Sequence, residues 1–197
     1  MTDYTVLRAS AETLLSVLKQ TITDSAEPDL SGVGIDLRSP EQLQEAHVKK
    51  VVSVWLYQLG VQPDMLNLPP RRLTEDTYAQ RPLPLELLFM ITAIHPDAGT
   101  QLALTGRVLQ VIDERSRLRG ADLQGSLAGT DAELRVSLDT ANLVESAELW
   151  YSLKAPFHLS VPIRMQVVTI DGLRPATVGP PVLDRRARIA QLVGEKA

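Results

Sequence analysis

The feature that most constrains the fold is the stretch from residue 134 to residue 170, because its apolar spacing changes twice. Residues 134–139 alternate between apolar and polar side chains, as a half-buried strand does. Residues 142–153 then show helical spacing, with an apolar face made of Leu143, Ala147, Trp150 and Leu153. Residues 159–170 alternate again, and one face carries Leu159, Val161, Ile163, Met165 and Val167. The stretch therefore predicts a strand, a short amphipathic helix and a longer strand, without recognisable chemistry.

The rest of the chain adds helices and strands around this unit. Residues 4–23 have the stripe of an amphipathic helix, and a short alternating run follows at 33–37. Residues 51–59 predict a strand that is apolar on both faces, which is typical of an interior strand or of one covered by a partner. Residues 83–94 predict the longest strand. This order predicts an α+β fold with a mainly antiparallel or mixed sheet, flanked by two to three helices.

Residues 97–118 predict the longest helix. Its predicted apolar face consists of Ala98, Leu102, Leu109 and Ile112. Gly106 lies in its middle, where glycine costs up to about 1 kcal/mol relative to alanine, so we expect another backbone to approach closely there. The arginines at 115, 117 and 119 are expected to end the helix, where cations are favoured.

Two segments depart from this regular pattern. Residues 60–81 are rich in proline and arginine, and a connection of that length tends to be functional. Residues 172–197 carry three prolines and are predicted to form an extended C-terminal arm, in which residues 183–193 can make a short basic helix. The predicted organisation is thus one α+β domain over residues 1–171 and an arm over residues 172–197.

Composition narrows the classes of function. The net charge of −4 argues against a general nucleic-acid binder, and the absence of cysteine excludes disulfides and thiolate metal sites. Neither a signal peptide nor a membrane span is recognisable, so a cytoplasmic protein is expected before any assembly. The three histidines are isolated, and the sequence lacks a phosphate-binding loop and a nucleophile elbow. The sequence therefore predicts no catalytic residues, no metal and no cofactor.

Candidate interface residues come from one strand and three arginine groups. They are Trp55, Tyr57, Arg71, Arg72, Arg117, Arg119, Arg185 and Arg186. Two interpretations stay open for the arginines, namely solvated surface or contacts at the rim of an interface with an acidic partner. Trp55 and Tyr57 fit either a core or a contact surface, whereas Trp150 is expected in the core.

Several blocks together resemble a known family. Residues 82–93 and 104–112 resemble its strand and the helix that follows, and residues 133–138, 149–153 and 156–163 resemble its closing unit. This is the family of cap or tail-terminator proteins of extracellular contractile injection systems, which are phage-tail-like particles built by bacteria. The resemblance extends over most of the chain between residues 7 and 170.

The resemblance implies a structural protein without enzymatic activity. Such proteins form a homohexameric ring that closes the distal end of the inner tube and contacts the last sheath layer. The implied partners are further copies of the chain, the inner-tube protein and the sheath protein, with no nucleic acid, membrane or cofactor. A small α+β binding module stays open as an alternative, with a peptide or small ligand in a groove beside Trp55 and Tyr57.

Overall fold

A computed structural model describes residues 3–67, 73–74, 77–78, 81–139, 143–173 and 177–178. The chain divides into two compact units, which are described here separately. The first comprises Met1–Asn67 and Pro82–Asp171, and the second comprises Leu68–Arg81 and Gly172–Ala197.

The first unit holds a mixture of helices and strands. In chain order these are α1 (Val6–Thr21), β1 (Gly34–Asp36), α2 (Pro40–Glu45), β2 (Val51–Val61), the 3₁₀ turn η1 (Pro63–Met65), β4 (Leu83–Ile94), α3 (Ala98–Glu114), β5 (Arg117–Arg119), η2 (Gly120–Asp122), η3 (Gly125–Leu127), β6 (Glu133–Leu138), α4 (Leu143–Ser152) and β7 (Ser160–Ile170). In the second unit, β3 (Thr77–Tyr78) pairs antiparallel with β8 (Thr177–Val178).

The first unit is built on a six-stranded sheet with the order β1-β2-β4-β7-β6-β5. Only β1 and β2 are parallel, and every other neighbouring pair is antiparallel. The prediction of an α+β fold with a mixed sheet is therefore confirmed. The described residues contain four α-helices, which is one more than expected.

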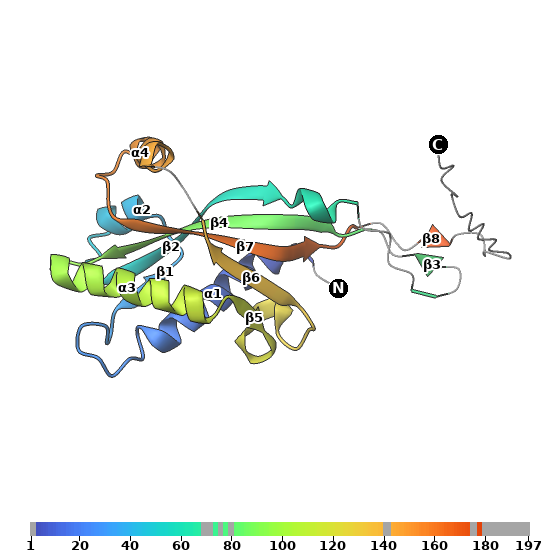
Figure 1. Cartoon of the computed structure of the whole chain (residues 1–197), viewed down its shortest axis with the longest axis horizontal. Coiled ribbons are helices and arrows are strands. Elements are labelled where there is room, and N and C mark those ends of the chain that lie inside the picture. Colours follow the sequence, from blue (N-terminus) through green and yellow to red (C-terminus); the bar gives the residue numbers. More distant parts are fainter. Residues whose placement is uncertain are drawn as a thin grey trace, which may run out of the picture. The chain divides into compact units, whose positions relative to one another are not determined.

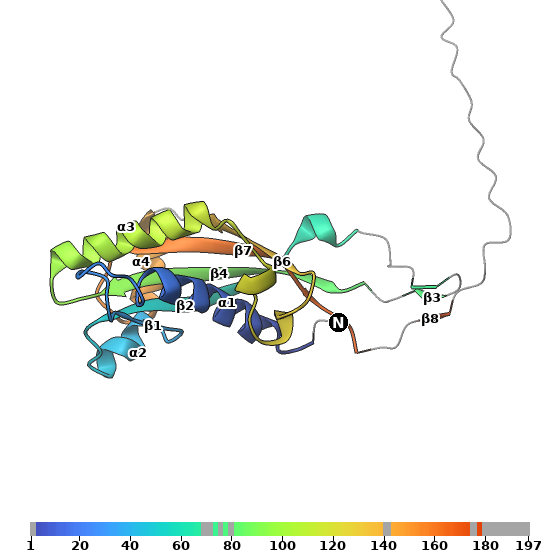
Figure 2. The ribbon, with the colours of Figure 1, turned by 90° about the horizontal axis from the view of Figure 1, so that it is seen from below.

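The main core lies on one face of the sheet, where α1 and α3 lie side by side (Figures 1 and 2). Its largest buried side chains include Leu14, Leu104, Phe89 and Ile163. Helix α4 lies on the opposite face, above the sheet in Figure 1. There it builds a small second cluster of Met90, Trp150 and Leu153. The two clusters explain why β2 is apolar on both sides.

Capping side chains determine where two helices begin. The Ser39 hydroxyl accepts a hydrogen bond from the Gln42 backbone N–H, and the Gln42 side chain accepts one from the Ser39 N–H. This capping box turns the polar stretch after residue 40 into the short helix α2. A carboxylate oxygen of Asp97 accepts from the Thr100 N–H at 2.7 Å and so begins α3.

The predicted apolar face of α3 is correct at Ile112 and wrong at Ala98, Leu102 and Leu109. Leu102 is 61% exposed and Leu109 is also exposed, whereas the buried face carries Leu104, Val108, Val111 and Ile112. Apolar residues occur at helical spacing on both sides of this helix, so the spacing alone did not decide which side is buried. The close backbone approach expected at Gly106 is also absent, because a Cβ built there meets no described atom within 4 Å.

Of the three arginines expected to end α3, Arg115 is its C-terminal cap, whereas Arg117 and Arg119 lie on a strand. The helix ends at Glu114, and Arg117 and Arg119 alternate with buried Leu118 along β5. Pairing with β6 explains the difference, since Leu118 faces Leu134 in the register.

One side chain of the closing unit differs from the prediction, and the alternation along β7 changes partway. Ala147 is exposed on α4, although Trp150 is buried as expected. In β7 every second residue is buried up to Met165, and the next buried residue is Val168, because the pairing with β4 shifts between Leu85 and Leu87. A bulge moves every later side chain to the other face. The side chain of Val167 lies outside the described residues.

Candidate functional site

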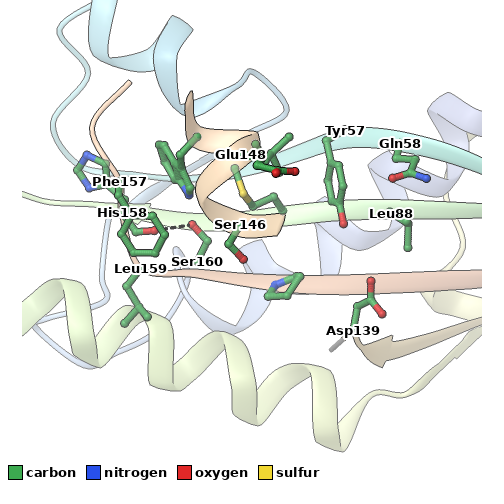
Figure 3. A pocket seen from close by; sticks show the side chains of 14 residues that line it. Tyr57, Gln58, Leu88, Asp139, Ser146, Glu148, Phe157, His158, Leu159 and Ser160 are labelled. Carbon is green, nitrogen blue, oxygen red and sulfur yellow. Dashed lines mark hydrogen bonds between the residues drawn. The ribbon is translucent and has the colours of Figure 1, made fainter. Parts of the chain in front are cut away.

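A pocket of about 550 Å³ opens beside α4 on its side of the sheet (Figure 3). Tyr57 of β2, Met90 of β4 and Pro162 of β7 contribute its sheet side. Helix α4 and the segment 157–160 that leads into β7 contribute the rest. A volume of this size is in the range of small-ligand and side-chain pockets.

The chain around α4 is shaped by a sharp turn. Lys154 adopts a positive φ of 53°, and its N–H donates to the Tyr151 carbonyl at 3.0 Å, so the helix ends just after Ser152. Pro156 follows and cannot continue a helix. The turn brings His158 and Phe157 against Trp150, with ring centroids 5.4 and 6.1 Å apart, respectively. Trp150 is only 2% exposed and holds the helix on the sheet.

Exposed apolar side chains lie on α4 and on the segment that follows it. Tyr151 is 87% exposed and Phe157 is 55% exposed. Together with Val144, Ala147 and Leu159 they form what we call the α4 patch. Exposed apolar surface that gathers in one place is typical of a contact site.

The charged side chains near the pocket differ in whether they form ion pairs. Arg164 lies 2.9 Å from a carboxylate oxygen of Asp139 and 3.2 Å from one of Glu86, so its charge is matched. Glu148 also lines the pocket, and it makes no ion pair with any described residue. Burial lowers the pKa of His158 below its ordinary value, which favours the neutral imidazole at pH 7. The described lining contains no lysine or arginine, so it is apolar with an acidic rim.

Ser160 and His158 of the pocket are engaged with structural partners. The Ser160 hydroxyl donates to the His158 carbonyl and lies 2.9 Å from the Thr92 hydroxyl. Nε2 of His158 lies 2.9 Å from the Gln44 amide nitrogen, so the imidazole is directed at α2 rather than at the serine. Among the described residues, no group of three histidine, aspartate or glutamate side chains is placed to hold a metal. The arrangement can bind an apolar group that carries a positive charge.

The structure separates the interface residues that the sequence predicted. Trp55 and Tyr57 pack on the cluster under α4 with ring centroids 6.1 Å apart, and Tyr57 lines the pocket. Arg117 and Arg119 are exposed on the edge strand β5, where Arg117 lies 4.0 Å from Glu133. The arginines at 71, 72, 185 and 186 lie outside the described residues.

Sequence reasoning missed the residues that form the α4 patch. One signal was present, because the apolar residues of α4 extend beyond the face that carries Trp150 and include Val144 and Tyr151. A helix of this kind is covered on more than one face. The segment after it offers Phe157 and Leu159 next to a proline, but nothing in their spacing indicates that they share a pocket.

A comparison with known protein families shows which family this chain belongs to. The sequence profile of the family described as the Pvc16 N-terminal domain matches residues 10–184. The chain belongs to the Pvc16 N-terminal domain family. No curated protein sequence matches the chain.

Two solved structures share the fold of this Pvc16 N-terminal domain. One is the PVC sheath/tube terminator, in the extended state, of an extracellular contractile injection system, with a TM-score of 0.65 at 15% sequence identity. The other is the tube-terminating cap of the anti-feeding prophage, with a TM-score of 0.59 at 16% identity. The alignments cover 100% and 96% of this chain. The chain spans only about two thirds of those proteins, namely 67% and 62% of their lengths.

In the described part of this family member, every helix is too short or too polar to span a bilayer.

Proposed function

We propose that this protein is a structural cap that terminates the inner tube of a contractile injection particle. The observation that carries the proposal is the family match over residues 10–184, joined to a fold shared with two tube terminators. The proposal includes a homohexameric ring at the distal end of the tube, in contact with the last sheath layer. It involves no catalytic residue and no cofactor, and assembly takes place in the cytoplasm.

The organisation of the chain is consistent with an assembly subunit. In this proposal, residues 1–171 are the capping domain and residues 172–197 reach neighbouring subunits. A standard interface buries about 800 Å² on each partner, and the α4 patch offers exposed apolar area for one. The exposed arginines at 117 and 119 offer a second, polar contact on another edge of the sheet.

Tube length in particles made with and without this protein tests the proposal. Electron micrographs of negatively stained particles should show tubes of uniform length with closed ends when the protein is present. Without it, tubes should vary in length and lack a cap at one end. Equal length distributions and ends in both preparations would mean that the protein is not a terminator.

A variant with reversed charges at Arg71 and Arg72 examines one proposed contact. If those arginines contact the tube or sheath, Arg71→Glu with Arg72→Glu should weaken docking, and more strongly at low salt than at high salt. The matched control is Arg8→Glu, because Arg8 is exposed on α1 and, among the described residues, its ion pair is with Glu12 of the same helix. Docking that is equally weak for both variants would indicate a general charge effect.

The pocket beside α4 favours one second candidate, a binding module for a peptide or small ligand. Tyr57 lines that pocket as the sequence suggested, whereas Trp55 packs behind it. The two candidate functions predict different masses of the protein in solution. A cap should form a ring of several copies when tube protein is added, whereas a small-ligand module should keep its mass.

A further inference from the structure

The lining of the pocket beside α4 restricts the chemistry of a group that could bind there. Its sheet side is apolar, burial lowers the pKa of His158, and the carboxylate of Glu148 at the rim makes no ion pair with any described residue. An apolar side chain next to a cation would fill the volume and meet Glu148. An acidic or purely polar segment would not, because it would place like charges together or leave the apolar lining in water.

The chain itself contains one segment with this chemistry beyond residue 178. Between Leu183 and Leu192, apolar residues alternate with Arg185, Arg186 and Arg188. Three cations within four positions are opposed by the single carboxylate of Asp184. We call residues 183–193 the basic segment.

Chain length decides which copy of the protein can supply the basic segment. The pocket lies at the Ser160 end of β7, and the arm begins after Ile170, at the opposite end of that strand. The ten steps from Ser160 to Ile170 span about 33 Å at roughly 3.3 Å each. The thirteen steps from Ile170 to Leu183 reach at most about 47 Å when fully extended, and residues 177 and 178 among them are paired with β3. A return to the same copy's pocket would use most of that length to run back along β7, which favours a neighbouring copy as the recipient.

We propose that the pocket beside α4 receives the basic segment of a neighbouring copy and so links adjacent subunits. The apolar side chains of the segment enter between α4 and the sheet, and its arginines pair with Glu148 at the rim. This is recognition of a short segment by a groove, with apolar anchors for affinity and charge for register. The inference rests on the proposed function, because it requires copies that stand side by side.

The natural absence of cysteine allows a direct test by disulfide trapping between two full-length variants. One variant carries Leu159→Cys in the pocket, where the side chain is exposed, and the other carries Leu192→Cys in the basic segment. The control variant carries Ala103→Cys, which is exposed on α3 at the opposite face of the sheet. The variants are mixed in pairs under mild oxidation, in solution and on assembled tubes, and the mixed disulfide is identified by mass.

A bound segment holds its thiol near the pocket at millimolar effective concentration. At about 10 μM protein, the pocket variant should therefore react about 10²-fold faster with the arm variant than the α3 control does. Adding Glu148→Lys to the pocket variant should slow the reaction at least about tenfold. Changing the three arginines of the arm variant to glutamate should slow it similarly, and combining the two changes should restore the rate, because the charges are then exchanged.

Each outcome has a defined meaning. Equal rates for the pocket and the α3 control would overturn the inference, as would disulfides formed by the pocket variant only with tube or sheath proteins carrying an introduced cysteine. Rates that do not respond to Glu148→Lys would overturn the role of charge. The tube-length measurement is independent: a cap that terminates tubes without the disulfide would contradict this inference alone, and the disulfide without termination would contradict the proposed function alone.

Discussion

At the scale of single residues, Trp150 has the largest expected effect on stability. Its indole is buried between α4 and the sheet and contacts the rings of His158 and Phe157. Trp150→Ala should lower the free energy of unfolding by about 3–5 kcal/mol, because truncating a buried aromatic leaves a cavity. Denaturation in urea measures this change. Tyr151→Ala is the matched control on the same helix, and it should stay within about 0.5 kcal/mol. Equal losses in both variants would contradict the assigned helix face.

His158 makes stability depend on pH. Burial lowers its pKa in the folded protein, so the unfolded chain binds a proton first as the pH falls below about 6.5. Stability should therefore decrease between pH 7 and pH 5.5. His158→Gln should reduce this dependence, whereas His47→Asn, at an exposed position, should leave it unchanged. Melting temperatures measured across this range check the prediction. A variant at 158 with the full pH dependence of the original protein would contradict it.

At the scale of elements, α3 offers a test of opposite sign. Gly106 is helical and has open space around it, so Gly106→Ala should raise the free energy of unfolding by about 0.5–1 kcal/mol. Gly120→Ala is the control, because Gly120 also has space but adopts a φ of +59° that disfavours any side chain. That variant should be destabilised. Chemical denaturation of both variants measures the change in the free energy of unfolding. A destabilised Gly106→Ala variant would indicate that another part of the chain does pack closely against Gly106.

Elements with one unambiguous pattern were predictable from the sequence. Strand β4 has the predicted bounds, because its alternation is long and is followed by His95 and Pro96. Strand β5 was not predictable, since three residues are too few to show a period. Tyr57 was a candidate before the structure, but Phe157 and Glu148 were not. They meet only because a turn at Lys154 folds α4 back onto the sheet, and no local pattern encodes that contact.

At the scale of the whole molecule, the C-terminal arm should be dispensable for folding and required for assembly. The buried core lies within the first unit, so deleting residues 176–197 should leave the melting temperature nearly unchanged. The same deletion should weaken ring formation or docking on the tube. Calorimetry measures the first effect, and mass in solution with tube protein measures the second. If the deletion variant assembles normally, the arm is not part of the interface between subunits.

The position of β7 has a consequence for how the protein is made. This strand lies between β4 and β6, although it is the last strand of the sheet to leave the ribosome. At roughly 5–20 residues per second, synthesis takes about 3–13 s to proceed from the end of β4 to the start of β7. During that time β4 can pair with β2, but its other edge lacks β7, and its side chains Leu87 and Phe89 lack part of the core that covers them in the folded protein. An unpaired strand edge promotes association with other chains. We therefore expect the nascent protein to be prone to association until β7 closes the sheet.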